Sequence, residues 1–199
     1  GIHRSGAPVT PPQRNIALPL RAESGRRFRA LVRRVDHDVW VDTANRAVIA
    51  RLRRSETGRM PEVLPFRHGR MAASPFGFLR GGAFVMAPDL MALPHTGYLV
   101  QICGDAHVRN LGAYSAPDGK IVFDVNDFDE TTRAPWEWDL KRLAASVVVA
   151  GRGASFAPAE VDVAVASMVH GYRMRMHQLS TMTPLDVWYD RVDVDAVLA

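Results

Sequence analysis

The sequence predicts an α+β fold that is mostly helical, with a small central β-hairpin. Several long segments repeat apolar residues at helical spacing, which favours amphipathic helices. One short apolar run at 98–103 is typical of a buried strand, and a turn signal at 116–119 separates two further short runs. The 199 residues, of which 47% are hydrophobic, are enough for one domain with a buried core.

The N-terminal part is expected to begin with an arm and continue as helices. Residues 1–22 hold four prolines and few apolar anchors, so we expect them to be extended or disordered. Apolar residues at helical spacing with arginines between them predict a helix over 23–41. A second, short helix is predicted over 46–53, and Gly58 and Pro61 follow it as breakers.

A third helical segment is expected from Ser74. Its hydroxyl can cap a helix, and Pro75 suits the first turn. The apolar stretch 76–86 therefore predicts a buried helix. Pro88 is expected to end or kink this helix, because proline cannot donate a hydrogen bond to the preceding turn.

The two short runs around the turn predict a hairpin of strands 111–115 and 120–124. With a four-residue turn, Leu111 would lie opposite Asp124. This register would bring Asn110 and Asp124 to the same end of the hairpin. An unbulged ladder would nevertheless place them on opposite faces, so Asn110 is expected in the preceding loop or next to a bulge.

Two helices are predicted to close the chain. Residues 136–149 return to helical spacing and are followed by Gly151 and Gly153, which favour a helix end. Residues 155–158 then open a last helix that runs to about Leu179.

The candidate functional residues lie between the predicted strands. Asp105 follows the first strand, and Asn110 comes five residues later. Asp124 ends a second apolar run, and this order is typical of the base and two Mg²⁺ ligands of kinases. Amide and carboxylate oxygens are ligands that Mg²⁺ accepts, and Asp127 is a reserve ligand. His107, two residues after Asp105, is a second catalytic candidate.

Two other function classes stay open on the sequence. The acidic residues between 124 and 130 also fit a solvated loop, in a domain that binds a partner without catalysis. A metal-dependent phosphoesterase is a further alternative, because Gly-Asp-x-His and an Asp-rich loop suit a two-metal site. That site would need more ligands, for which residues 36–38 (Asp-His-Asp) are the remaining candidates.

Composition limits the remaining classes. Residues 1–80 hold 16 of the 25 basic residues, but aromatic residues do not interleave with them regularly, as a stacking surface would need, so nucleic-acid binding is disfavoured. No apolar stretch approaches the ~20 residues that a membrane span needs. The single cysteine, Cys103, excludes an internal disulfide, which fits a cytoplasmic protein.

Four long motifs in order resemble a bacterial family, domain of unknown function 2252. The motifs are 70–81 (RMAASPFGFLRG), 103–112 (CGDAHVRNLG), 122–131 (VFDVNDFDET) and 136–146 (WEWDLKRLAAS). The resemblance covers about residues 25–190. Proteins of that family are about twice as long, so it implies that residues 23–199 are the N-terminal part of one domain whose C-terminal half is missing.

The central motifs also resemble, more remotely, the aminoglycoside phosphotransferase and choline kinase group. This resemblance implies part of the C-lobe of a protein kinase-like fold. It implies that Asp105 is the base, that Asn110 and Asp124 hold Mg²⁺, and that Asp139 braces the loop. ATP or another nucleotide would be the cofactor, and a small molecule with a hydroxyl group the acceptor.

The sequence departs from that group at some positions. Cys103 stands where the group has histidine. No glycine-rich phosphate loop or strand lysine precedes the central motifs, since the only lysines are Lys120 and Lys141. The resemblance implies that both elements follow in the missing half. Arg70 and Arg80, within the first family motif, are candidates for phosphate or substrate contact.

Overall fold

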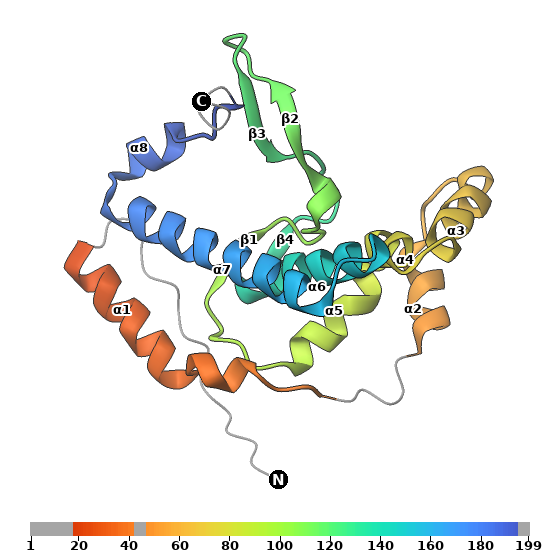
Figure 1. Cartoon of the computed structure of the whole chain (residues 1–199), viewed down its shortest axis with the longest axis horizontal. Helices are drawn as coiled ribbons and strands as arrows, with labels where there is room; N and C mark the ends of the chain where they lie inside the picture. Colours follow the sequence, from red (N-terminus) through yellow and green to blue (C-terminus); the bar gives the residue numbers. More distant parts are fainter. Residues whose placement is uncertain (1–17, 42–46, 195–199) are drawn as a thin grey trace.

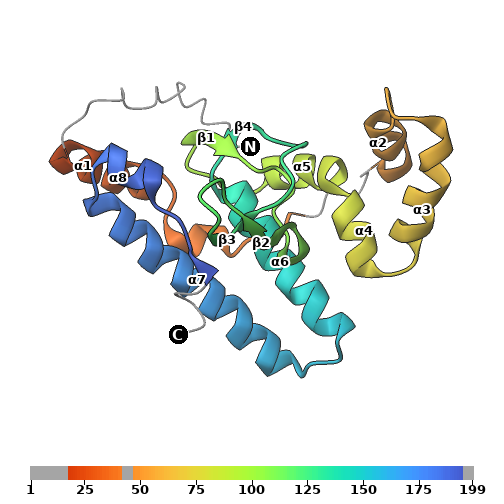
Figure 2. The ribbon, with the colours of Figure 1, turned by 90° about the horizontal axis from the view of Figure 1, so that it is seen from above.

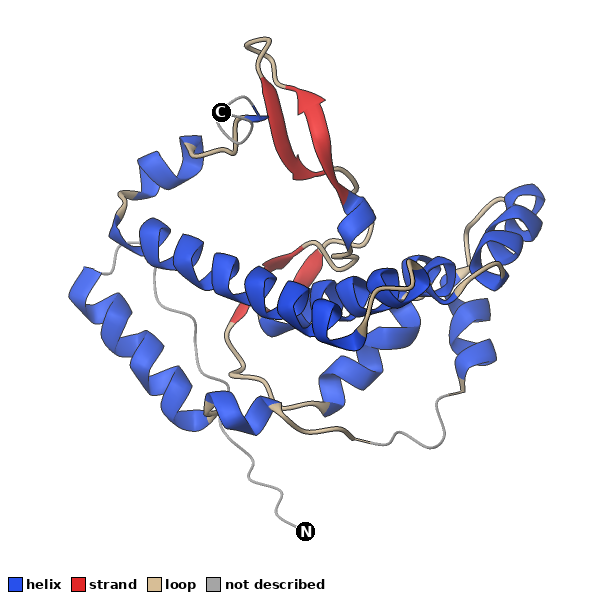
Figure 3. Cartoon of the chain, viewed as in Figure 1, coloured by secondary structure: helices blue, strands red, loops and turns tan. Residues whose placement is uncertain are grey.

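The computed structural model describes residues 18–41 and 47–194 (Figure 1). In chain order the elements are α1 (Leu18–Leu31), η1 (Arg34–His37), α2 (Val48–Ser55), η2 (Pro61–Val63), α3 (Leu64–Ala72), α4 (Pro75–Gly81), α5 (Ala83–Ala92), β1 (Leu99–Ile102), η3 (Val108–Asn110), β2 (Leu111–Ser115), β3 (Ile121–Val125), β4 (Thr132–Pro135), α6 (Glu137–Gly153), α7 (Pro158–Thr181) and α8 (Pro184–Tyr189). Helices predominate, and the strands form two separate pairs (Figure 3). The predicted α+β class is confirmed.

Within the described ranges, no helix is both long and apolar enough to cross a membrane.

Helices α6 and α7 form a long antiparallel pair beside the strands (Figure 2). Their close approach depends on Gly151, where a Cβ atom would lie 2.8 Å from the Cγ2 atom of Val161. At the other end of α6, the indole of Trp136 stacks on Tyr172 of α7 with ring centroids 6.0 Å apart. Both predicted helices are confirmed, with α6 continuing to Gly153.

The strands form two antiparallel ribbons, β1 with β4 and β2 with β3. The hairpin β2–β3 is confirmed, but its predicted register is wrong by one residue, because Leu111 pairs with Val125 and Gly112 with Asp124. The N–H of Ala116 donates to the carbonyl of Lys120 at 2.8 Å, which leaves a three-residue loop with Gly119 at φ +82°. Three-residue loops with a left-handed glycine are common in hairpins.

The N-terminal helix differs from the prediction. It begins at Leu18 and ends at Leu31, so the expected arm is at least five residues shorter and the helix does not reach residue 41. The carboxylate of Asp36 accepts a hydrogen bond from the backbone N–H of Arg33 at 2.7 Å, and this local contact favours the short 3₁₀ turn η1 over a continued helix. Residues 1–17 lie outside the described part of the chain, as does Arg46, the expected start of α2.

The predicted helix over 76–86 is divided in two. Ser74 caps α4 as expected, with its Oγ atom accepting the N–H of Gly77 at 2.9 Å. The break falls at Gly82, where a Cβ atom would lie 2.8 Å from the carbonyl oxygen of Phe78. Helix α5 then continues past Pro88 to Ala92. Proline removes one hydrogen bond from the helix, but the burial of Val85 and Leu90 on either side of it offsets this loss.

Candidate active site

The candidate site is built on the segment between β1 and β2, which we call the central loop (residues 103–110). The loop packs against the acidic turn (residues 126–131) that precedes β4. Gly104 lies at this contact with φ +80°, and a Cβ atom there would lie 2.9 Å from the carbonyl carbon of Glu130. Only glycine satisfies both the left-handed backbone and this close approach.

Asp139, in the first turn of α6, holds the start of the central loop. Its carboxylate accepts the backbone N–H of Cys103 at 2.7 Å and that of Gly104 at 3.0 Å. Burial raises the pKa of Asp139, and the two backbone hydrogen bonds offset this rise only in part. Hydrogen bonds of this kind, from the loop backbone to Asp139, are what the predicted bracing role of Asp139 would require.

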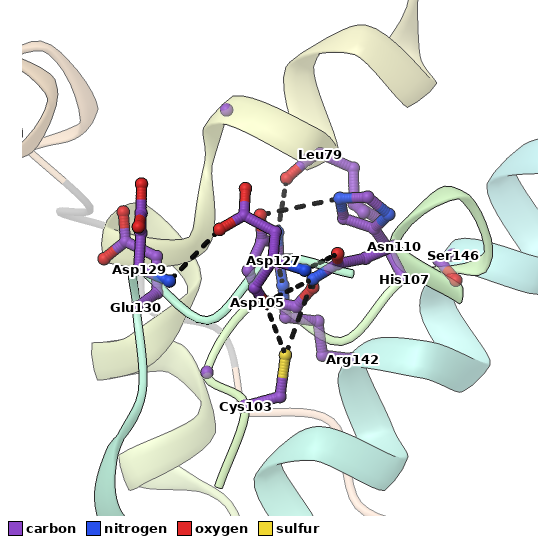
Figure 4. Close-up of polar contacts among 12 residues, drawn as sticks. Leu79, Cys103, Asp105, His107, Asn110, Asp127, Asp129, Glu130, Arg142 and Ser146 are labelled. Carbon is purple, nitrogen blue, oxygen red and sulfur yellow. Dashed lines mark hydrogen bonds and ion pairs between the residues drawn. The ribbon is translucent and has the colours of Figure 1, made fainter. Parts of the chain in front are cut away.

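Asn110 joins the central loop to the acidic turn. Its side chain is 4% exposed, and its Oδ1 atom accepts the N–H of Asp127 at 2.9 Å. Its Nδ2 atom donates to the carbonyls of Asp105 and Asp127, both at 3.1 Å (Figure 4). Asn110 lies in η3, before the ladder begins, as the strand-alternation argument required. One amide group therefore brings the backbones of Asp105 and Asp127 together.

The partly buried carboxylate of Asp105 forms an ion pair with the buried Arg142 of α6. The Nε atom of Arg142 donates to Oδ1 of Asp105 at 2.9 Å, and Nη2 contacts the same oxygen. Nη2 also donates to the carbonyl of Leu79 at 2.6 Å, and Nη1 lies 3.4 Å from the sulfur of Met86. Arg142 is 1% exposed. This arginine is a site residue that the sequence reasoning missed.

A signal for Arg142 was present in the spacing along α6. Asp139, Arg142 and Ser146 follow one another at intervals of three and four residues, which places them on one helix face. All three contact the central loop, Ser146 by accepting the N–H of Val108 at 3.1 Å. Polar residues at helical spacing inside an apolar helix can thus indicate a loop that the helix supports.

His107 lies on the other side of Asp105. Its Nε2 atom is 3.5 Å from Oδ2 of Asp105, and its ring packs edge-to-face on Phe76. The ring is 4% exposed, and its Nδ1 atom is buried without a hydrogen-bond partner among the described residues. In this geometry His107 contacts Asp105 directly, and its own catalytic role stays a prediction.

The two neighbours control the ionisation of Asp105. Burial by itself raises the pKa of this carboxyl group. The hydrogen bond from His107 and the charge and hydrogen bonds of Arg142 lower it by more, so the pKa of Asp105 lies below its ordinary value. Asp105 is therefore a carboxylate at neutral pH.

Asp124 does not join this group. The shifted register puts it opposite Gly112, exposed to solvent, with its Oδ1 atom accepting the N–H of Val125 at 2.7 Å. In the part of the chain that the structure describes, no hydrogen bond or ion pair links it to Asp105 or Asn110. Asp127, the reserve ligand, is exposed and bonds to Asn110 through its backbone N–H and carbonyl, while its carboxylate accepts the N–H of Asp129 at 3.1 Å.

The remaining candidate residues lie outside the central loop and the acidic turn. Arg70 is exposed in the last turn of α3, and Arg80 is exposed in the last turn of α4, next to Leu79. The side chain of Asp36 pairs with Arg33. Within residues 18–41 and 47–194, no three His, Cys, Asp or Glu side chains gather as a metal-binding cluster.

The comparisons with known proteins agree with the motifs. A family model described as an uncharacterized protein conserved in bacteria (DUF2252) matches residues 59–199. The chain belongs to this family. The matched region includes the central loop, the acidic turn and α6. No curated protein and no solved structure matches the chain.

Proposed function

We propose that this chain carries the reaction loop of a phosphotransferase that uses a magnesium nucleotide and a hydroxyl acceptor. The supporting observation is the Asn110 amide, which bonds to the backbones of Asp105 and Asp127 at once. The segment that carries Asp105 and Asn110 is thereby held against the segment that carries Asp127. Phosphoryl transfer needs mainly positioned reactants and charge neutralisation, which side chains on these two segments can supply.

Asp105 is proposed to orient the attacking hydroxyl group. As a carboxylate it can accept a hydrogen bond from the acceptor, and its side chain keeps partial exposure beside the buried Arg142. Its low basicity fits orientation better than early proton removal. This fits the loose transition state, in which the acceptor needs little activation.

Asn110 and Asp127 are proposed to hold Mg²⁺, with Asp127 in place of Asp124. The Asn110 oxygen has a second lone pair beyond the one that accepts the Asp127 N–H. Asp127 is exposed, and its backbone N–H bonds to this oxygen. Mg²⁺ typically takes one or two protein carboxylates or amides, and phosphates and waters complete its shell, so these residues fit the ion. The ion would neutralise charge on the nucleotide phosphates.

The test is nucleotide-dependent stabilisation of the full protein. With Mg·ATP at about 100 times its Kd, we expect stabilisation of about 2.7 kcal/mol, visible as a rise in Tm. Asp127→Asn should remove most of this rise, and the matched Asp124→Asn should retain it. The reverse pattern would contradict the ligand assignment.

Two other outcomes would favour the alternatives. Hydrolysis of p-nitrophenyl phosphate with Mn²⁺ or Zn²⁺, without nucleotide, would support a phosphoesterase. Neither nucleotide binding nor hydrolysis would support a non-catalytic domain.

A further inference from the structure

Arg142 connects two segments that are far apart in sequence. Asp105 lies 37 residues before it and Leu79 lies 63 residues before it, yet one guanidinium group bonds to both (Figure 4). The first bond fixes a side chain of the central loop, and the second fixes a backbone carbonyl at the end of α4. Arg142 therefore sets the distance between these two segments.

The end of α4 is held at a second point. The Nη2 atom of Arg67 donates to the carbonyl of Gly81 at 2.6 Å. Arg80 thus lies between two residues, Leu79 and Gly81, whose carbonyls are each bonded to an arginine. Cationic side chains commonly satisfy the free carbonyls at a helix C-terminus. Here they also fix the backbone from which the exposed Arg80 side chain extends.

We infer that Arg142 is a positioning residue for the proposed transfer: it fixes the orientation of the Asp105 carboxylate and holds the end of α4 against the central loop. This inference rests on the proposed function and extends it to a residue outside the loop. Arg142 is buried, so it acts through Asp105 and α4 and not on a substrate.

The guanidinium fork is essential to this role. Arg142 uses Nε and Nη2 for Asp105, and it also uses Nη2 for Leu79. A lysine ammonium keeps the charge opposite Asp105 but lacks the planar fork, so it cannot hold both partners in the same geometry. Arg142→Lys therefore separates positioning from charge.

The first measurement is turnover of Mg·ATP by the full protein, with water as acceptor and phosphate release as readout. We expect Arg142→Lys to lower kcat by about ten- to a hundredfold, the loss typical of small misplacement. The KM for Mg·ATP should change by less than about threefold, because Arg67 still holds Gly81. The matched control is Arg152→Lys, at the exposed end of the same helix.

The same substitution in an Asp105→Asn background distinguishes positioning from general stability. Because Arg142 acts partly through the carboxylate, Arg142→Lys should cause a smaller loss of kcat there than in the wild-type background, with the remaining loss due to the Leu79 contact. An equal loss in both backgrounds, or no loss in the wild-type background, overturns the inference.

Hydrogen exchange gives a readout that needs no activity. Arg142→Lys should speed exchange about tenfold or more in peptides covering 76–86 and 103–110, and leave the α7 peptides unchanged. Unchanged exchange in both segments overturns the inference, and so does faster exchange throughout the protein. Absence of ATP turnover in the wild type would refute the proposed function alone, because exchange still decides whether Arg142 holds the two segments.

A second variant covers the case in which Arg142→Lys does not fold. Asp105→Asn with Arg142→Met leaves no buried charge unpaired, so this double variant should fold. Compared with Asp105→Asn alone, it should speed exchange in 76–86 by about tenfold, because Leu79 loses its donor. Equal exchange in the two variants overturns the inference.

Discussion

Gly104→Ala tests whether the central loop is packed against the acidic turn as tightly as the geometry requires. Alanine at φ +80° costs about 1–2 kcal/mol in backbone strain. The new methyl group would also lie 2.9 Å from the carbonyl carbon of Glu130 and closer to its oxygen, so backbone must shift. Overpacking of this kind costs typically about 1–3 kcal/mol more. We expect a total loss of about 2–5 kcal/mol in the free energy of unfolding.

Gly119→Ala is the matched control for this experiment. Gly119 has nearly the same φ, +82°, but nothing lies within 4 Å of the position that a methyl group would take there. It should therefore lose only the backbone strain. With a urea m-value of about 2 kcal/mol/M, a further 2 kcal/mol in Gly104→Ala lowers the urea midpoint by about 1 M relative to Gly119→Ala. Equal midpoints for the two variants would refute the packing argument.

Three further substitutions test the contacts of the site. Asn110→Leu should lower the free energy of unfolding by about 2–4 kcal/mol in urea titrations, because it leaves two carbonyls and one N–H without partners. A loss below about 1 kcal/mol would contradict the bridging role of Asn110. Asp139→Asn should speed amide exchange at Cys103 and Gly104, since the two N–H groups bond to different carboxylate oxygens and an NH₂ donor would replace one of them. Unchanged exchange at both amides contradicts the brace. The pKa of Asp105 in the folded state is lower than its unfolded value of 3.8. The stabilising effect of its carboxylate is therefore complete above pH 3.8 and disappears as pH falls through the folded-state pKa. The stability difference between wild type and Asp105→Asn should therefore be largest at neutral pH and should shrink as pH falls below 3.8, and a difference that grows in that direction has the wrong sign.

The sequence predicted those parts of the fold that depend on local patterns. Helices α6 and α7, the Ser74 cap and the hairpin each follow from spacing or turn chemistry within a short segment. The hairpin register did not follow, because the same Pro-Asp-Gly turn is compatible with loops of three or four residues. The one-residue shift places Asp124 opposite Gly112 and not opposite Leu111.

The sequence predicted the candidate residues of the central loop and Asp139, but it did not predict that Arg142 of α6 supports the loop. Asp105, Asn110 and Asp139 stand in motifs, and the structure brings all three to one place. The pairing of Arg142 with Asp105 depends on how α6 packs under the loop, which is tertiary information that spacing alone does not give.

The three loop contacts on α6 have a consequence for length variation in this family. A helix advances 100° per residue, so one residue inserted between Asp139 and Arg142 would turn Arg142 and Ser146 away from the loop together. An insertion at the tip of the β2–β3 hairpin, around Gly119, would disturb none of these contacts. We therefore expect natural or engineered chains to tolerate extra residues at the hairpin tip and to lose the site after an insertion in the first three turns of α6.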